Sequence, residues 1–211
     1  VDCDAIVHLA AVSTVIACDE DPAATFRTNI TGSYNIARLA YGRRVIFASS
    51  LTASEPNSSY SESKRLVEPL FPVVLRMGNV IGGNDPSHTH VLPTLVRAAM
   101  CGTTFTITST LESSRHYINV DDVCSAFELL LQRGYGIFDC CYKEATTLST
   151  MIALVEAETQ RPIQRTMGKM RPGEAHVWAG NSRALHQLGW NPWRSLRESV
   201  KQAVYSYRAA T

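Results

Sequence analysis

Three residues between positions 50 and 64 carry side chains that could together move a proton. Ser50 closes the stretch "FASS", and Tyr60 and Lys64 stand four positions apart in "NSSYSESKRLVEP". Residues four apart share one face of a helix, so the phenol and the ammonium would lie side by side there. The alternative is two surface residues near a strand end, since chance gives about 0.15 Y-x-x-x-K matches in a chain of this composition.

The chemistry expected of this trio is the interconversion of an alcohol and a ketone. A free phenol has a pKa of about 10, which is too high for a base at neutral pH. A lysine ammonium and a nicotinamide cation would both favour the phenolate and lower the pKa of Tyr60. The Ser50 hydroxyl would bridge the tyrosine and a substrate oxygen. Tyr60 would then accept a hydroxyl proton while hydride leaves the same carbon for the cofactor.

Strands and helices alternate along the first part of the chain and would position this trio. Continuous apolar runs, typical of strands covered on both faces, occupy residues 4–11, 44–50 and 72–83. Helices are expected over 23–41 and 60–68. This alternation predicts an α/β fold with a doubly wound parallel sheet. Right-handed crossovers would then bring the strand ends at 10–11, 49–50 and 77–79 to one crevice.

The second part of the chain predicts shorter elements. Helices are expected over 91–100, 121–132 and 147–158, and strands over 105–108 and 136–142. Thr147 is a candidate N-cap. Ser195 and Glu198 in "SLRE" form a candidate capping box at the start of the last helix.

Composition excludes several classes of function. The 211 residues are 45% hydrophobic with a formal net charge of +1, which suits one compact unit and lacks the basic footprint of a nucleic-acid binder. The six cysteines include no C-x-x-C pair, and no apolar stretch is long enough for a bilayer. With no signal peptide visible, we expect a cytoplasmic protein with reduced thiols. His88 and His90 lack a carboxylate or thiol at ligand spacing, so no metal site is expected.

The order of short motifs along the chain resembles a known family. "DAIVHLAA", "DP" with N-x-x-G (Asn29, Gly32), "VIFASS", Y-x-x-x-K, "LRMGNVIG", "VLPTLVRAA", "RHYINVDDV", "RPGE" and "LGWNP" follow one another from residue 4 to about 200. This series resembles the extended short-chain dehydrogenase/reductase family, in its NAD-dependent sugar epimerase/dehydratase branch typified by UDP-glucose 4-epimerase. The resemblance implies a partial Rossmann-like core over 1–83. It also implies a small C-terminal α/β substrate subdomain over 84–211, from which 115–145 return to the core.

The resemblance also implies a role for individual positions. The catalytic residues would be Ser50, Tyr60 and Lys64. The cofactor, NAD with NADP not excluded, would contact Leu9, Ala10, Ala11, Thr28, Ala48, Ser49, Tyr60, Lys64, Met77 and Gly78. The nucleotide-diphosphate sugar would contact Asn79, His90, Val91, Arg115, Arg171 and Glu174. Arginine suits diphosphate because its planar fork pairs two oxygens at once.

Several of these residues have simpler explanations. Arg76 would be a structural partner of another side chain, and Arg115 an ordinary salt-bridging strand residue. His8 would be a packed strand histidine. Asp121 and Asp122 would occupy a helix N-terminus, where the macrodipole favours acids, without forming a metal site.

The chain also departs from the family pattern. It contains no G-x-x-G-x-x-G, the glycine-rich turn that holds a dinucleotide pyrophosphate, and the first three strands of the family fold are missing. The loop between Ser50 and Tyr60 is short, and "TSTLESSRHY" replaces a glycine-rich turn. We therefore expect a trimmed or decaying relative, or part of a longer chain. The open edge at 5–9 should be covered by another copy in a homo-oligomer, by the missing half, or by a rearranged segment.

The leading functional expectation is an NAD-dependent nucleotide-sugar 4-epimerase. Such an enzyme oxidises the 4-hydroxyl, lets the keto-sugar turn over, and returns hydride to its other face. Leu51 and Thr52 stand where dehydratases of the family carry an Asp-Glu pair, which argues against dehydration. The alternatives are an NAD(P)-dependent nucleotide-sugar reductase or dehydratase, and a truncated non-catalytic remnant that binds a sugar nucleotide or a partner.

Overall fold

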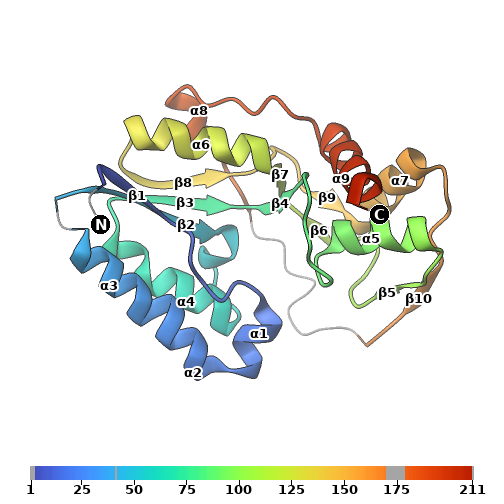
Figure 1. Cartoon of the computed structure of the whole chain (residues 1–211), viewed down its shortest axis with the longest axis horizontal. Helices are drawn as coiled ribbons and strands as arrows, with labels where there is room; N and C mark the ends of the chain where they lie inside the picture. Colours follow the sequence, from blue (N-terminus) through green and yellow to red (C-terminus); the bar gives the residue numbers. More distant parts are fainter. Residues whose placement is uncertain (1–2, 41, 170–178, 211) are drawn as a thin grey trace. The chain divides into compact units, whose positions relative to one another are not determined.

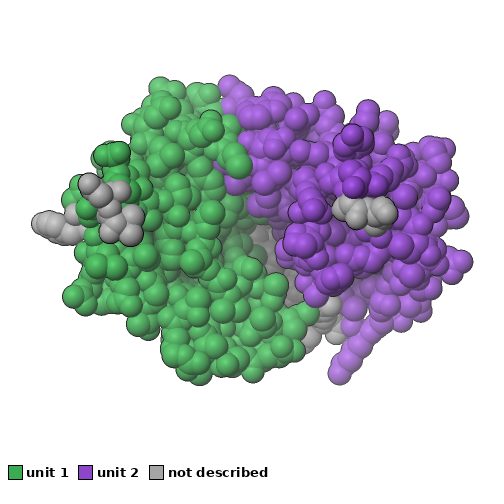
Figure 2. Space-filling model, in the orientation of Figure 1, with its two compact units in different colours: residues 1–78, 124–141, 178–190 green, residues 79–123, 142–177, 191–211 purple. Residues whose placement is uncertain are grey.

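Two compact units make up the chain. The computed structural model describes residues 3–40, 42–169 and 179–210. Unit 1 comprises residues 1–78, 124–141 and 178–190, and unit 2 comprises 79–123, 142–177 and 191–211 (Figure 2). The functional division expected at residue 83 stays a prediction. Within the described residues, no helix has both the length and the apolar character needed to cross a bilayer.

A four-stranded parallel sheet forms the centre of unit 1. In spatial order its strands are β1 (Ala5–His8), β2 (Arg44–Ser50), β3 (Val73–Met77) and β8 (Gly136–Cys140). All neighbours are parallel, and Ser50 pairs with Met77, which pairs with Cys140. The carboxyl ends of the strands therefore meet at one edge, as the alternation of elements predicted (Figure 1). This arrangement confirms the α/β fold with a parallel sheet.

Helices cover both faces of the unit 1 sheet (Figure 1). On one face lie α1 (Val15–Glu20), α2 (Pro22–Thr25), the π-helical η1 (Phe26–Thr31), α3 (Gly32–Leu39) and α4 (Ser59–Val67). On the other lie α8 (Arg183–Gln187) and the part of α6 (Val120–Gln132) that belongs to unit 1. Short 3-10 turns η2 (Leu51–Ala53) and η3 (Glu68–Leu70) flank α4. The helix expected over 23–41 is thus real, but a π-helical stretch interrupts it.

The core of unit 1 explains why β2 is so apolar. Phe47 stacks on Phe71 with centroids 4.8 Å apart, and Val45, Val67 and Val74 complete a cluster between the sheet and its helices. All five are buried. Each buried aliphatic or aromatic side chain contributes about 1.5–3 kcal/mol of transfer free energy. The β2–α4 contact that carries Ser50, Tyr60 and Lys64 is therefore a packed part of the core.

Unit 2 consists of helices and three two-stranded sheets. Its helices are α5 (Val91–Cys101), α7 (Leu148–Thr159) and α9 (Leu196–Ala210), with the first residues of α6. Its strand pairs are β4 (Asn79–Ile81) with β7 (Tyr117–Asn119), β5 (Phe105–Ile107) with β10 (Arg165–Met167), and β6 (Ser114–Arg115) with β9 (Thr146–Thr147). Leu95, Met151 and Val204 from the three helices meet in one buried cluster. The strand expected to run from residue 72 into a glycine-rich loop by residue 83 is interrupted at Gly78, which separates β3 from β4.

Helix caps in unit 2 follow the sequence signals. The Thr147 hydroxyl accepts the Thr150 N–H at 3.1 Å and begins α7. The Ser195 hydroxyl accepts the Glu198 N–H at 3.2 Å, while the Glu198 carboxylate accepts the Ser195 N–H at 2.7 Å. Both predicted caps are confirmed, because capping depends on residues only three apart.

The first strand lies at an edge of its sheet. Among the described strands, β1 pairs with β2 and with no other, so its far edge has no partner strand. No rearranged strand among the described residues therefore pairs with this edge. Coverage by a second copy or by the missing half stays a prediction.

Candidate active site

The end of β2 and the first turns of α4 bring the candidate trio together in unit 1. Ser50 is the last residue of β2, while Tyr60 and Lys64 lie one turn apart on α4. The helix starts at this point because Ser58 and Ser61 form a reciprocal capping box. The Ser58 hydroxyl accepts the Ser61 N–H at 3.3 Å, and the Ser61 hydroxyl accepts the Ser58 N–H at 3.0 Å. The cap fixes where Tyr60 stands on the helix.

Lys64 is buried against β2. Lys64 is only 4% exposed, and its Nζ donates to the Ala48 carbonyl at 2.8 Å. The same Nζ lies 4.8 Å from the centre of the Phe47 ring. Burial lowers the pKa of Lys64 to about 8, against the opposing effect of Cys18 and Glu68. The ammonium is therefore held in place and close to neutralisation at physiological pH.

The pKa of the Tyr60 phenol is raised, whereas that of Lys64 is lowered. Burial raises the pKa of Tyr60 to about 12, and a hydrogen bond with the Ser50 side chain only partly opposes this. Lys64 Nζ lies 6.0 Å from the Tyr60 ring centre. From the sequence, two positive charges were expected to lower the pKa of Tyr60, namely those of Lys64 and of a nicotinamide ring. Only the first belongs to the chain, and it does not offset burial, so the expectation of a lowered pKa is wrong for the chain alone.

Thr52 prepares Ser50 to donate its proton. The Ser50 oxygen accepts the Thr52 N–H at 3.3 Å and the Thr52 hydroxyl at 3.0 Å. With both contacts made to its oxygen, Ser50 directs its own O–H elsewhere. The hydroxyl can thus bridge Tyr60 and a substrate oxygen, which is the role expected of it.

Asn29, which had no assigned role, anchors the loop after β1. Its Oδ1 accepts the Val12 N–H at 2.8 Å, and its Nδ2 donates to the Val12 carbonyl at 2.9 Å and to the Ser63 hydroxyl at 2.9 Å. Asn29 is buried, whereas Leu9 and Ala10 just before the anchored loop are exposed. One amide therefore ties the β1 loop to the helix that carries Tyr60. The N-x-x-G motif marked the residue, but only the fold reveals its partners.

The remaining predicted cofactor positions also lie in unit 1. Thr28 is exposed on η1, and Ala48 and Ser49 are buried at the end of β2. Met77 and Gly78 are half-buried at the end of β3, where the Gly78 N–H donates to the Cys140 carbonyl at 3.0 Å. Their role in binding a cofactor stays a prediction.

The predicted substrate positions that the structure describes lie in unit 2. Asn79 begins β4 and is exposed, and His90 and Val91 begin α5. Arg115 is half-buried on β6, and its Nη1 donates to the Ser114 carbonyl at 2.8 Å. The predicted sites at Arg171 and Glu174 lie outside the described residues.

His90 has a carboxylate partner that sequence spacing missed. Its Nδ1 lies 2.8 Å from Oδ2 of Asp85. The expectation that no carboxylate stands near this histidine is therefore wrong. No group of three potential metal ligands forms among the described residues.

His8 is a packed strand histidine. It is buried, its Nε2 makes a 2.9 Å hydrogen bond with the Ser33 hydroxyl, and its ring contacts Phe47 and Phe71. Burial lowers the pKa of His8, and the charge of Lys64 lowers it further. The imidazole is thus held neutral inside the core.

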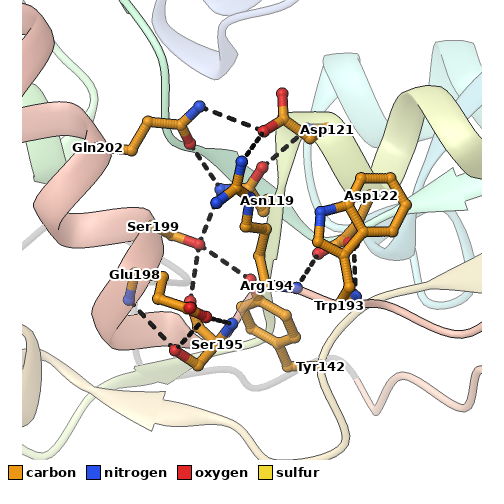
Figure 3. A network of polar contacts seen from close by, with 10 residues as sticks. All are labelled: Asn119, Asp121, Asp122, Tyr142, Trp193, Arg194, Ser195, Glu198, Ser199 and Gln202. Atoms are coloured by element: carbon orange, nitrogen blue, oxygen red, sulfur yellow. Dashed lines mark hydrogen bonds and ion pairs between the residues drawn. The ribbon is translucent and has the colours of Figure 1, made fainter.

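Asp121 and Asp122 belong to a structural polar network in unit 2 (Figure 3). Asp122 is buried, and its Oδ1 accepts the Trp193 N–H at 2.8 Å. Asp121 accepts from Arg194 at 3.2 Å. In the same network Asn119 donates to α9 at the Ser199 hydroxyl, 2.9 Å away. These acids hold the segment before α9 and occupy the first turn of α6, as expected of a helix N-terminus.

Comparisons with known proteins agree on one family. The model described as "NAD dependent epimerase/dehydratase family" matches residues 1–140. The UDP-glucose 4-epimerase of Lactobacillus helveticus is 24% identical, over 90% of this chain and 72% of the epimerase. The GDP-6-deoxy-D-mannose reductase of Pseudomonas aeruginosa is 23% identical, over 98% of this chain and 81% of the reductase. The structure of Thermotoga maritima UDP-glucose 4-epimerase with UDP-glucose is 26% identical, with a TM-score of 0.92, over 98% of this chain and 78% of that chain.

Proposed function

This chain belongs to the NAD dependent epimerase/dehydratase family, and from that premise we propose that it is a nucleotide-sugar 4-epimerase. One observation carries the proposal. A phenol that is hydrogen-bonded to Ser50 stands one helical turn from the buried ammonium of Lys64, at the carboxyl edge of a parallel sheet. Ligands of open α/β sheets bind at this edge.

Three of the residues predicted to contact a dinucleotide are open to solvent. Leu9 and Ala10 are exposed just before the Asn29-anchored loop, and Thr28 is exposed on η1. When bound, NAD supplies the hydride acceptor. The residues that would hold it are Leu9, Ala10, Ala11, Thr28, Ala48, Ser49, Met77 and Gly78, with Tyr60 and Lys64.

Proton transfer falls to Tyr60. With a pKa of about 12 its phenol is protonated at neutral pH and is a weak acid. A positive charge brought near would lower this pKa and make it a base. Tyr60 Oη would then accept the proton of the sugar 4-hydroxyl through Ser50 and would later return a proton to the 4-keto oxygen.

The substrate proposed is a nucleotide-diphosphate sugar. Arg115 would pair the diphosphate through its guanidinium, with Asn79, His90 and Val91 beside it. The epimerases from L. helveticus and T. maritima support this class. Dehydration is disfavoured, because Thr52 donates its hydroxyl to Ser50 at 3.0 Å in place of a carboxyl acid or base.

The test is the interconversion of UDP-glucose and UDP-galactose in the presence of NAD, followed by proton NMR. We expect turnover by the wild-type chain and a loss of about 10²- to 10⁴-fold in Tyr60→Phe, since the variant lacks the transferable proton. NAD binding, measured by fluorescence, should persist in that variant, because the substitution removes only the Tyr60 hydroxyl and leaves the other residues that would hold the cofactor unchanged. Turnover that is equal in both proteins would refute the assignment of Tyr60.

A reductase is the second candidate, favoured by the P. aeruginosa relative, which aligns with 98% of this chain. A reductase would consume NAD(P)H stoichiometrically with a keto-sugar nucleotide, whereas an epimerase regenerates its cofactor. Absence of NAD(H) binding at millimolar concentration would favour a remnant that binds only a sugar nucleotide or a partner.

A further inference from the structure

A buried carboxylate lies directly behind the candidate trio. Glu68 is 3% exposed, and both of its carboxylate oxygens accept hydrogen bonds. Oε1 accepts the Ser49 hydroxyl at 2.6 Å and the Arg76 Nε at 2.8 Å, and Oε2 accepts the Arg76 Nη2 at 2.6 Å. The bidentate geometry with arginine is the strongest form of such a pair. This contact also confirms Arg76 as a structural partner.

The partners of Glu68 place it between three elements. Ser49 precedes Ser50 at the end of β2, and Arg76 precedes Met77 at the end of β3. Ser49 and Arg76 are also register partners in the sheet. Glu68 itself follows α4 directly, one turn after Lys64. One side chain therefore fixes the proposed catalytic helix to both strand ends.

The helix ends alone do not explain an acid at this position. Glu68 is the C-cap of α4, where the macrodipole disfavours negative charge, and also the first residue of η3, where the macrodipole favours it. Taking a carboxylate out of water adds a further cost. The residue is therefore better explained by what it does for its neighbours than by its own helix.

The charges around Lys64 come from several elements. Cys18 on α1 and Glu68 after α4 both raise the pKa of Lys64, while burial lowers it. The charge of Lys64 lowers the pKa of His8 on β1. Tyr60 lies one turn before Lys64 on α4. Arg76 on β3 forms an ion pair with Glu68, and this pair weakens the effect of the carboxylate on the pKa of Lys64. The charge of Asp139 on β8 in turn raises the pKa of Arg76.

We propose that Glu68 is a positioning residue, whose carboxylate locks α4 onto the ends of β2 and β3 and places a negative charge one helical turn after Lys64. The proposal rests on the proposed function only in treating Lys64 as a catalytic residue. It is tested by a titration that needs no turnover, so a failure of either proposal is recognised separately.

The experiment is an NMR titration of lysines labelled with ¹³C at Cε, from pH 6 to pH 11. The chain has four lysines, and Lys64→Arg identifies the signal of Lys64. In Glu68→Gln, which keeps the shape but removes the charge, we expect the midpoint of Lys64 to fall by about one pH unit. Glu62→Gln is the matched control, because Glu62 is exposed on the same helix. In this variant the midpoint of Lys64 should equal the wild-type value.

A second variant guards against a Glu68→Gln chain that does not fold. Arg76→Gln removes a nearby cation and frees the Glu68 carboxylate, so the midpoint of Lys64 should rise. Loosened packing alone would admit water and raise the midpoint in both variants. An unchanged or raised midpoint in folded Glu68→Gln overturns the proposal, and so does an unchanged or lowered midpoint in Arg76→Gln.

Discussion

Burial moves the phenol and the ammonium of the candidate site toward their neutral forms. The pKa of Tyr60 rises to about 12 and that of Lys64 falls to about 8, in each case chiefly because the charged form loses water. The two groups therefore begin as a protonated phenol and a lysine that titrates near physiological pH. A cation arriving beside them would reverse the first shift, which makes the site sensitive to what binds there.

The lowered pKa of Lys64 predicts a pH-dependent stability. The folded pKa is about 8 against 10.5 for the ordinary group, so between these values the unfolded chain binds more protons. The free energy of unfolding should therefore gain up to about 3 kcal/mol as pH rises through this window, and the gain disappears as pH falls to 8. Lys64→Met should lack this slope in urea unfolding between pH 7.5 and pH 10. Parallel curves for the two proteins would contradict the assigned burial.

At the scale of elements, short-range signals were predictable and long-range ones were not. The bounds of β2 and the caps at Thr147 and Ser195 follow from local patterns that the sequence displays. The π-helical stretch and the break at Gly78 depend on contacts with other segments. Glu68 was equally hidden, because its partner Ser49 lies 19 residues away. Periodicity carries no record of such pairs.

The link from η1 to the β1 loop predicts a selective effect of Asn29. Asn29→Ala would leave the backbone N–H and C=O of Val12 without their partner, at a cost of about 1–3 kcal/mol in stability. We also expect weaker NAD binding, since the loop at 9–11 loses its anchor. Urea unfolding and NAD fluorescence measure the two effects.

Asn35→Ala is the control for this change, because Asn35 is exposed on α3 next to η1. It should behave as wild type in both measurements. Equal effects of the two substitutions would show that the contacts of Asn29 matter no more than helix composition.

At the scale of the whole molecule, the open edge of β1 predicts association. An apolar edge strand with free N–H and C=O groups is a template for pairing, so we expect a second copy or a preceding segment of a longer chain to cover it. The given chain by itself should therefore form a homo-oligomer. Light scattering should give a multiple of 23.2 kDa, and the β1 amides should exchange with deuterium as slowly as those of β2. A 23.2 kDa species whose β1 amides exchange rapidly would contradict this expectation.

The π-helical turn η1 limits which insertions and deletions this segment can tolerate. A π-helical turn holds one residue more than a regular turn, and here that extra residue lets Asn29 face inward while Phe26, Arg27 and Thr28 face solvent. Deleting one residue would give a smoother helix and would rotate the amide away from Val12. Length in this segment is therefore constrained more tightly than the identity of its outward-facing side chains.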